Sequence, residues 1–140
     1  MRPELDEALV RDFPYLFRLR HHRDDGPREP ISFGFTIEDG WEPLIRRLAE
    51  RLEPIAATTD LRAVQVKEKS AALRFYVEHG SLPAEVMAHV RATILAARDE
   101  SERTCERCGA PSVLRGVSYV QTLCSQCADR VAMREREPER

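Results

Sequence analysis

The sequence predicts an α+β fold: a small antiparallel sheet or hairpin packed by two amphipathic helices, with a zinc ribbon at the C-terminal end. Two stretches carry apolar residues at helical spacing, the segment between them alternates apolar and polar residues, and four cysteines stand in two close pairs. The chain has 140 residues, of which 42% are hydrophobic and 33% charged. It therefore has enough apolar material for one core and is too short for two large domains.

The first twenty residues predict a helix followed by a segment that docks on the core. Leu5 and Leu9 lie near one helical face, and Pro14 then interrupts the pattern. The side chains expected to dock on the core after this break are Tyr15, Leu16, Phe17 and Leu19. Residues 21–30 contain two prolines and a glycine and are typical of an exposed loop, whereas residues 31–37 predict a short strand.

A long amphipathic helix is predicted to start at Asp39. This residue is expected to be the N-cap, with Glu42 as its capping-box partner and Pro43 in the first turn. The apolar residues spaced for one inner face are Leu44, Ile45, Leu48, Leu52 and Ile55. This spacing indicates a helix that packs on a sheet.

Two strands joined by a turn are predicted to follow. Val64 and Val66 alternate with polar residues, as strands that are buried on one face do. Leu73, Phe75 and Val77 repeat this alternation. Residues 67–71 are expected to form the hairpin turn between the two strands.

A second long helix is predicted after the hairpin. Ser81 is expected to cap it, Pro83 to occupy its first turn, and Ser101 to lie near its end. Its inner face is expected to consist of Val86, Val90, Ile94 and Ala97. The chain then divides into an α+β body at residues 1–101, a four-cysteine zinc ribbon packed on the body at 102–134, and a frayed tail at 135–140.

The cysteines give the most specific functional signal. Cys105 and Cys108 form one Cys-x-x-Cys pair, Cys124 and Cys127 form another, and 15 residues separate the pairs. This spacing is typical of structural zinc, because two such pairs complete a tetrahedron of thiolates. Gly109 offers the positive φ that a tight knuckle turn tends to need. Iron would fit the same sulfurs and a redox pair is a further alternative, but four thiolates leave no open position for catalysis.

Several basic residues and one tryptophan are candidate contacts for a partner. The net charge is -2, so the whole chain does not attract nucleic acid, and any such contact must be local. Arginines near the cysteines roughly balance the charge of a zinc tetrathiolate. Trp41 is expected either to fill the core or to anchor a partner, with the core favoured. The candidate contacts for nucleic acid or a partner are Arg18, Arg20, Arg23, Trp41, Arg103, Arg107, Arg115 and Arg130.

One weaker pattern points to catalysis. His21 and His22 stand beside Asp24 and Asp25, and imidazole and carboxylate groups at short range can exchange protons near neutral pH. No nucleophile with a recognisable local context accompanies them. A solvated loop is the simpler interpretation.

A set of short motifs between residues 33 and 128 resembles a pattern found in small uncharacterised proteins of bacteria and their phages. The motifs include Asp39-Gly40-Trp41, the Lys-Glu-Lys run at 67–69, Leu73-Arg74-Phe75-Tyr76 and the two cysteine pairs. Where that pattern often has a glycine pair after the Lys-Glu-Lys run, this chain has Ser-Ala-Ala at 70–72. The resemblance implies a small α/β body that ends in a metal knuckle, and it implies no activity.

Together these patterns predict a non-enzymatic, zinc-stabilised binding module in the cytoplasm, with a protein partner favoured and a role in phage–host conflict or regulation. The N-terminal segment is acidic and no apolar run is long enough to span a membrane. Two alternatives stay open. One is a zinc ribbon that binds nucleic acid, and the other is an enzyme that uses the His/Asp loop at 21–25.

Overall fold

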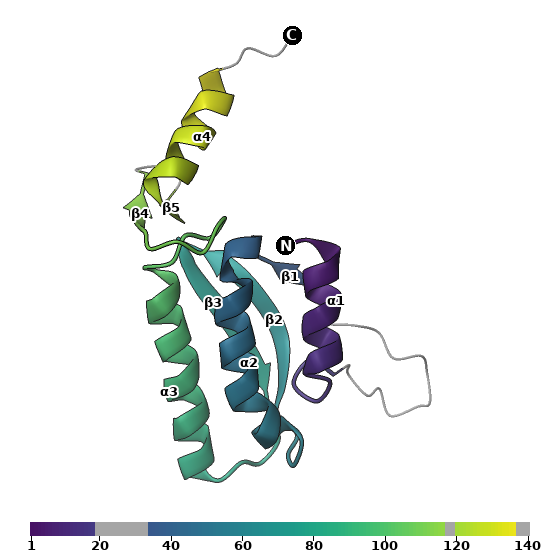
Figure 1. Ribbon diagram of the computed structural model, residues 1–140. Coiled ribbons are helices and arrows are strands. Elements are labelled where there is room, and N and C mark those ends of the chain that lie inside the picture. The colour runs from purple at the N-terminus through teal and green to yellow at the C-terminus, as the bar shows by residue number, and fades with distance from the viewer. Residues whose placement is uncertain (19–33, 117–119, 137–140) are drawn as a thin grey trace.

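The computed structural model describes residues 1–18, 34–116 and 120–136, which form a two-layer body and a smaller C-terminal unit (Figure 1). The sheet of the body contains β1 (Phe35–Thr36), β2 (Arg62–Lys69) and β3 (Ala72–Glu78). The helices α1 (Pro3–Asp12), α2 (Glu42–Ala56) and α3 (Ala84–Ser101) lie together on one face of this sheet. The C-terminal unit contains β4 (Val113–Arg115), β5 (Gln121–Leu123) and α4 (Ser125–Arg136). The predicted α+β class is confirmed.

The sheet is mixed, whereas the sequence predicted only antiparallel pairing. The strand order is β1-β2-β3, with β1 parallel to β2 and β2 antiparallel to β3. A short 3-10 helix η1 (Asp39–Trp41) and α2 connect the parallel pair, as a crossover connection must. Of the strand predicted at 31–37, Phe35 and Thr36 are paired and residues 31–33 lie outside the described part of the chain.

A β-bulge alters the expected alternation in β2. The register shifts between Ala63 and Gln65, so Ala63 and Val66 are the buried residues of this strand. Val64, which the alternation placed inside with Val66, is half-buried. In β3 the predicted pattern is confirmed for Leu73 and Phe75, which are 1% and 5% exposed. A bulge inserts one residue, and the side chains on either side of it change faces relative to a regular strand.

The hairpin turn is shorter than predicted. Pairing continues to Lys69 and resumes at Ala72, which leaves a two-residue loop. Ser70 and Ala71 have φ of 53° and 62°, as both central residues of a type I′ turn require. L-residues adopt this region at an energetic cost, so the loop is strained.

Neither predicted helix cap forms. Asp39 lies within η1, and its carboxylate instead accepts hydrogen bonds from the backbone N and the Nε of Arg2, at 2.8 and 2.6 Å. Trp41 is the N-cap of α2 without a side-chain cap bond, and Glu42 accepts from Arg46. The N-cap of α3 is Pro83, not Ser81. Sequence alone does not show that another segment competes for a capping carboxylate.

Of the residues after α1 that were predicted to dock, Leu16 and Phe17 do so, Tyr15 does not, and Leu19 lies outside the described part of the chain. Leu16 and Phe17 are fully buried, and the Phe17 ring packs edge-on against Phe35, with centroids 5.1 Å apart. Tyr15, which the sequence placed on the core, is 50% exposed. The carboxylate of Glu53 accepts hydrogen bonds from the backbone N of Tyr15 and of Leu16, at 3.0 and 2.9 Å, and so fixes the turn that leaves Tyr15 outside.

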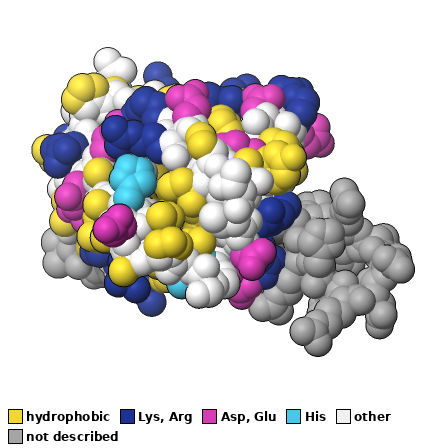
Figure 2. Space-filling view, turned by 90° about the horizontal axis from the view of Figure 1, so that it is seen from below, with side chains coloured by type: hydrophobic (Ala, Val, Ile, Leu, Met, Phe, Trp, Pro, Cys, Tyr) yellow, Lys and Arg dark blue, Asp and Glu magenta, His cyan; other side chains and the backbone are white. Residues whose placement is uncertain are grey.

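The core lies between the sheet and the three helices. Leu44, Ile45, Leu48 and Leu52 of α2 are at most 3% exposed, as their spacing predicted. In α3 the buried residues are Val90, Thr93, Ala97 and Ser101, while Val86 and Ile94 are half-buried against the core. The end of the body that holds the C-terminus of α2 and the N-terminus of α3 shows both signs of charge around apolar and uncharged side chains (Figure 2). Among the described side chains in this view, basic and acidic groups are interspersed.

The strained turn makes a stability prediction. Replacing Ser70 with glycine should raise the free energy of unfolding by about 0.5–1 kcal/mol, because glycine adopts a positive φ without penalty. Urea unfolding with an unchanged m-value would measure this gain. The control is Ser81→Gly at an exposed serine without a positive φ, where the substitution should be neutral or destabilising. Destabilisation by Ser70→Gly would contradict the interpretation that the turn is strained.

Candidate metal centre

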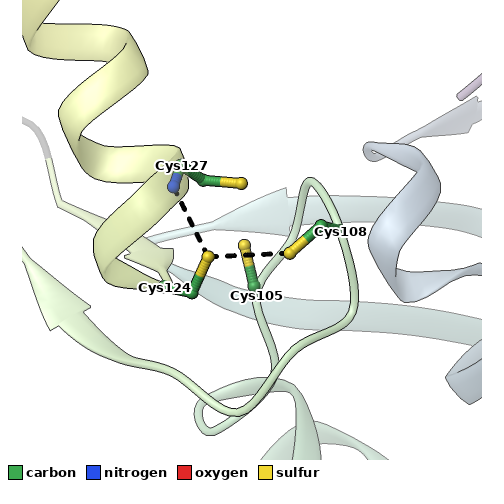
Figure 3. A group of neighbouring side chains, drawn as sticks. All are labelled: Cys105, Cys108, Cys124 and Cys127. Atoms are coloured by element: carbon green, nitrogen blue, oxygen red, sulfur yellow. Dashed lines mark hydrogen bonds between the residues drawn. The ribbon is translucent and has the colours of Figure 1, made fainter.

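The four cysteines come together at one point between the body and α4 (Figure 3). Their sulfur atoms all lie within 4.8 Å of one another, and the Sγ atoms of Cys108 and Cys124 are 3.6 Å apart. Ligands in a regular tetrahedron with bonds of roughly 2.3 Å lie about 3.8 Å from one another, so the cluster matches one bound metal ion. All four cysteines are free, and none forms a disulfide.

The first knuckle is a tight turn after α3. The backbone N of Gly109 donates to the carbonyl of Cys105 at 2.8 Å, and the N of Cys105 donates to the carbonyl of Ala110 at 2.7 Å. Gly109 has φ of 78°, which confirms the conformational role that the sequence predicted for it. Cys105 is buried and Cys108 is exposed. The turn therefore presents one sulfur from inside and one from the surface.

The second knuckle joins β5 to α4. Cys124 follows β5, and Cys127 lies in the first turn of α4, where its backbone N donates to the Sγ of Cys124 at 3.4 Å. The sequence predicted a strand over 117–123. The structure pairs Gln121–Leu123 with Val113–Arg115, and residues 117–119 lie outside the described ranges. Helix α4 was not predicted: it includes Glu135 and Arg136, which the sequence assigned to a frayed tail, while 137–140 are not described.

The thiols of the second knuckle differ in acidity. The hydrogen bond from the Cys127 amide, helped by the neighbouring thiols, lowers the pKa of Cys124 to about 7. Burial and the same neighbours raise the pKa of Cys127 to about 12. Four thiolates at this spacing repel one another, and a divalent cation offsets that repulsion. The four sulfur donors thus fit a soft or borderline metal ion. Among the described residues, no further His, Asp or Glu side chain joins this cluster as a potential ligand.

The first knuckle is docked on the body through η1. The backbone N of Gly40 donates to the carbonyl of Glu106 at 2.8 Å, and the Nε1 of Trp41 donates to the carbonyl of Thr104 at 2.8 Å. A Cβ on Gly40 would lie 2.3 Å from the carbonyl oxygen of Cys105. Only glycine permits this approach of two backbones.

The second knuckle is docked on the hairpin turn. The hydroxyl of Thr122, which is fully buried, donates to the carbonyl of Ala71 at 2.8 Å, and the carbonyl of Thr122 accepts from the N of Glu106 at 3.0 Å. Burial at this junction, together with the nearby carboxylates of Glu38 and Glu68, raises the pKa of Glu106 to about 7. Both knuckles are therefore held to the body as well as to each other.

Four of the six predicted partner contacts that the structure describes have roles inside the fold. Trp41 is fully buried, which confirms the core interpretation and removes it as a surface anchor. The guanidinium of Arg18 donates to the carbonyl of Thr59 at 2.7 Å, and Arg115 donates through Nε to the carbonyl of Leu123 at 2.7 Å. Arg107 is ion-paired with Glu38 at 3.1 Å. Arg103 and Arg130 are exposed.

The remaining candidates lie in residues 19–33, outside the described part of the chain. These candidates are Arg20, Arg23, His21, His22, Asp24 and Asp25. The enzymatic alternative therefore stays a prediction. Among the described residues, sequence reasoning missed Gly40 as a docking position, because the signal for it is a contact with a segment more than 60 residues away.

The scan against protein-family models found no matching family, and the searches of curated proteins and of solved structures found no significant match. In the described part of the chain, no helix is both long and apolar enough to cross a lipid bilayer. The centre is therefore interpreted from its geometry alone.

Loss of one sulfur should destabilise the C-terminal unit through the metal. Cys108 is exposed, so Cys108→Ser removes a ligand with little change in packing. Because a metal of this type contributes on the order of 10 kcal/mol, losing one of four ligands should cost on the order of 3 kcal/mol of unfolding free energy. In excess chelator the variant and the parent should unfold at the same denaturant concentration. A difference that persists in chelator would contradict a metal-mediated effect.

The close approach at Gly40 makes a second prediction. Gly40→Ala should lower the unfolding free energy by about 3 kcal/mol, because backbone atoms of the first knuckle cannot make room for a methyl group. The matched control is Gly80→Ala, whose Cβ would meet only the flexible carboxylate of Asp60. Denaturant unfolding of both variants measures the difference. If Gly40→Ala and Gly80→Ala have the same free energy of unfolding, the docking contact is dispensable.

Proposed function

We propose that this protein is a non-enzymatic binding module whose C-terminal unit is folded by a structural zinc ion. The observation that carries the proposal is the convergence of four cysteine sulfurs within 4.8 Å. In a tetrahedral site with four thiolates, the protein occupies every coordination position of the metal, whereas catalytic zinc keeps one position for water or substrate. The ion then acts as a cross-link and takes no part in chemistry.

Zinc is favoured over iron by the form of the site. Two Cys-x-x-Cys pairs with this separation, one after a helix and one between a hairpin and a helix, are typical of zinc ribbons. Iron binds the same donors, so metal analysis of the purified protein separates the two metals. We expect one zinc ion per chain.

A protein partner is favoured by the exposed apolar side chains of the C-terminal unit. Val113 and Leu114 of β4 are 58% and 59% exposed, and Met133 of α4 is 68% exposed. The described part of the chain has six large apolar side chains that are exposed, and these are three of them. The C-terminal unit, however, makes up only about a quarter of the described residues. Exposed apolar residues, methionine in particular, are enriched where proteins meet. The regulatory or phage–host setting stays a prediction.

Nucleic-acid binding by the ribbon itself is less well supported. Arg107 and Arg115 are engaged within the fold, which leaves Arg103 and Arg130 as the exposed members of the predicted set on this unit. A nucleic-acid surface usually has a clearly basic face. The two exposed arginines of the predicted set do not by themselves form such a face.

A cobalt-substituted protein tests the structural role of the ion. Cobalt(II) in place of zinc should give the visible spectrum of a tetrahedral tetrathiolate, and added azide or imidazole should leave that spectrum unchanged because no coordination position is open. Titration by absorbance measures both properties. A spectrum that shifts on addition of either ligand would mean an open site and would contradict the proposal.

A capture experiment tests the protein partner. The zinc-loaded full chain is immobilised and exposed to nuclease-treated extract of its own cells, and the retained protein is compared with that held by Leu114→Ser/Met133→Ser. The matched control is Tyr15→Ser/Leu95→Ser, which removes two exposed apolar side chains from the body. We expect loss of the retained protein, by roughly tenfold, only for the first variant. Equal retention by both variants would exclude the C-terminal unit as the contact surface.

A further inference from the structure

The face of the sheet that is turned away from the helices carries a basic cluster formed by Lys67, Lys69 and Arg74. Successive strand residues point to opposite faces. Val66 and Phe75 point toward the helices and are buried, so Lys67 and Arg74 point the other way. Helices α1, α2 and α3 all lie on the buried face (Figure 1), and none of the helices that the structure describes covers the basic one.

Two members of the basic cluster are opposite each other on neighbouring strands. Lys67 and Arg74 are directly opposite in the β2–β3 register, and like charges in this position destabilise a sheet. In the described residues, no ion pair involves any of the three cations of the cluster. At the other end of the same hairpin Arg62 is opposite Glu78 and pairs with it. The fold neutralises one end of this face and leaves the other end positive.

An exposed aromatic ring completes the surface. Tyr76 is 43% exposed, and the Nζ of Lys67 lies 5.7 Å from the centre of its ring. Gln65, which is opposite Tyr76 in the register, adds an amide that can donate and accept hydrogen bonds. A ring flanked by cations on an open sheet face is the arrangement by which proteins bind single strands, with bases stacked on the ring and phosphates at the cations.

We infer that this helix-free face binds single-stranded nucleic acid, with a base on Tyr76 and phosphates at Lys67, Lys69 and Arg74. The inference is independent of the metal centre and goes beyond the proposed protein-binding role. An acidic protein segment would use the cations but would gain little from the exposed ring. The phosphate backbone would also remove the repulsion that the fold leaves unneutralised between Lys67 and Arg74.

Fluorescence anisotropy with labelled 20-nucleotide oligo(dT) and oligo(rU) tests the inference on the zinc-loaded full chain. Three phosphate contacts predict a slope of about -2 for the logarithm of affinity against the logarithm of salt concentration, or roughly 15-fold weaker binding at 200 than at 50 mM salt. Lys67→Gln/Arg74→Gln should weaken binding at 50 mM at least tenfold. Tyr76→Ala should weaken it about tenfold, and Tyr76→Phe, which keeps the ring, should bind within about twofold of the parent.

The matched control is Arg51→Gln/Arg91→Gln, which makes the same charge change at two exposed positions on α2 and α3. This variant should bind as the parent does. The inference is overturned if the parent binds neither oligonucleotide at 50 mM salt, or if the control loses as much affinity as the sheet variant. It is also overturned, in favour of an acidic protein segment, if polyglutamate competes equally well and Tyr76→Ala has no effect.

A stability measurement separates binding from a folding defect. Lys67→Glu places opposite charges across the strands, so its melting temperature should equal or exceed that of the parent while oligonucleotide binding is lost. Residues kept for binding at a cost in stability behave in this way. If Lys67→Glu lowers the melting temperature and reduces binding only in proportion to unfolding, the basic cluster serves the fold and the inference fails.

Discussion

The four-sulfur centre is the constraint on which the C-terminal unit depends, because the described residues of this unit form almost no core of their own. The buried apolar residues there are Leu123 and two of the cysteines, Cys105 and Cys127. So few buried side chains cannot offset the conformational entropy of ordering more than thirty residues. The four sulfurs converge from the knuckle after α3 and from the start of α4 (Figure 3), so a metal ion held by them would fix both segments at once. The body, by contrast, has a continuous core between its sheet and helices.

Docking joins these two sources of stability. The contacts at Gly40 and Trp41 hold the first knuckle, and the contact between Thr122 and Ala71 holds the second. Each uses a backbone carbonyl as acceptor, while the donor is the backbone N at Gly40 and a side chain at Trp41 and Thr122. These contacts therefore orient β4, β5 and the first turn of α4 on the body, which is what a module needs if it is to present a defined surface.

The sequence was most informative where one physical cause dominates. Thiolate spacing identified the four cysteines that the structure brings together, and apolar periodicity placed the inner faces of α2 and α3, because ligand geometry and burial leave few alternatives. Capping failed at Asp39, where the carboxylate had a second donor in Arg2, a residue distant in the chain. The bulge beside Val64, the parallel position of β1 and the approach at Gly40 all arise from tertiary contacts. The local propensities of a sequence do not reflect such contacts.

Two features of the same hairpin are energetically unfavourable: a positive φ in the turn and a repulsion between two cations. Only the second indicates a ligand. The positive φ of Ala71 is unfavourable, but its backbone N donates to Glu68 and its carbonyl accepts from Thr122, so the turn is held by the fold that it helps to dock. The repulsion between Lys67 and Arg74 is offset by no ion pair among the described residues, and the contact of Lys67 with the Tyr76 ring leaves both positive charges in place. A cost that the rest of the fold offsets is structural. A repulsion between cations that no carboxylate offsets, next to an exposed aromatic ring, is the one that a bound anion would relieve.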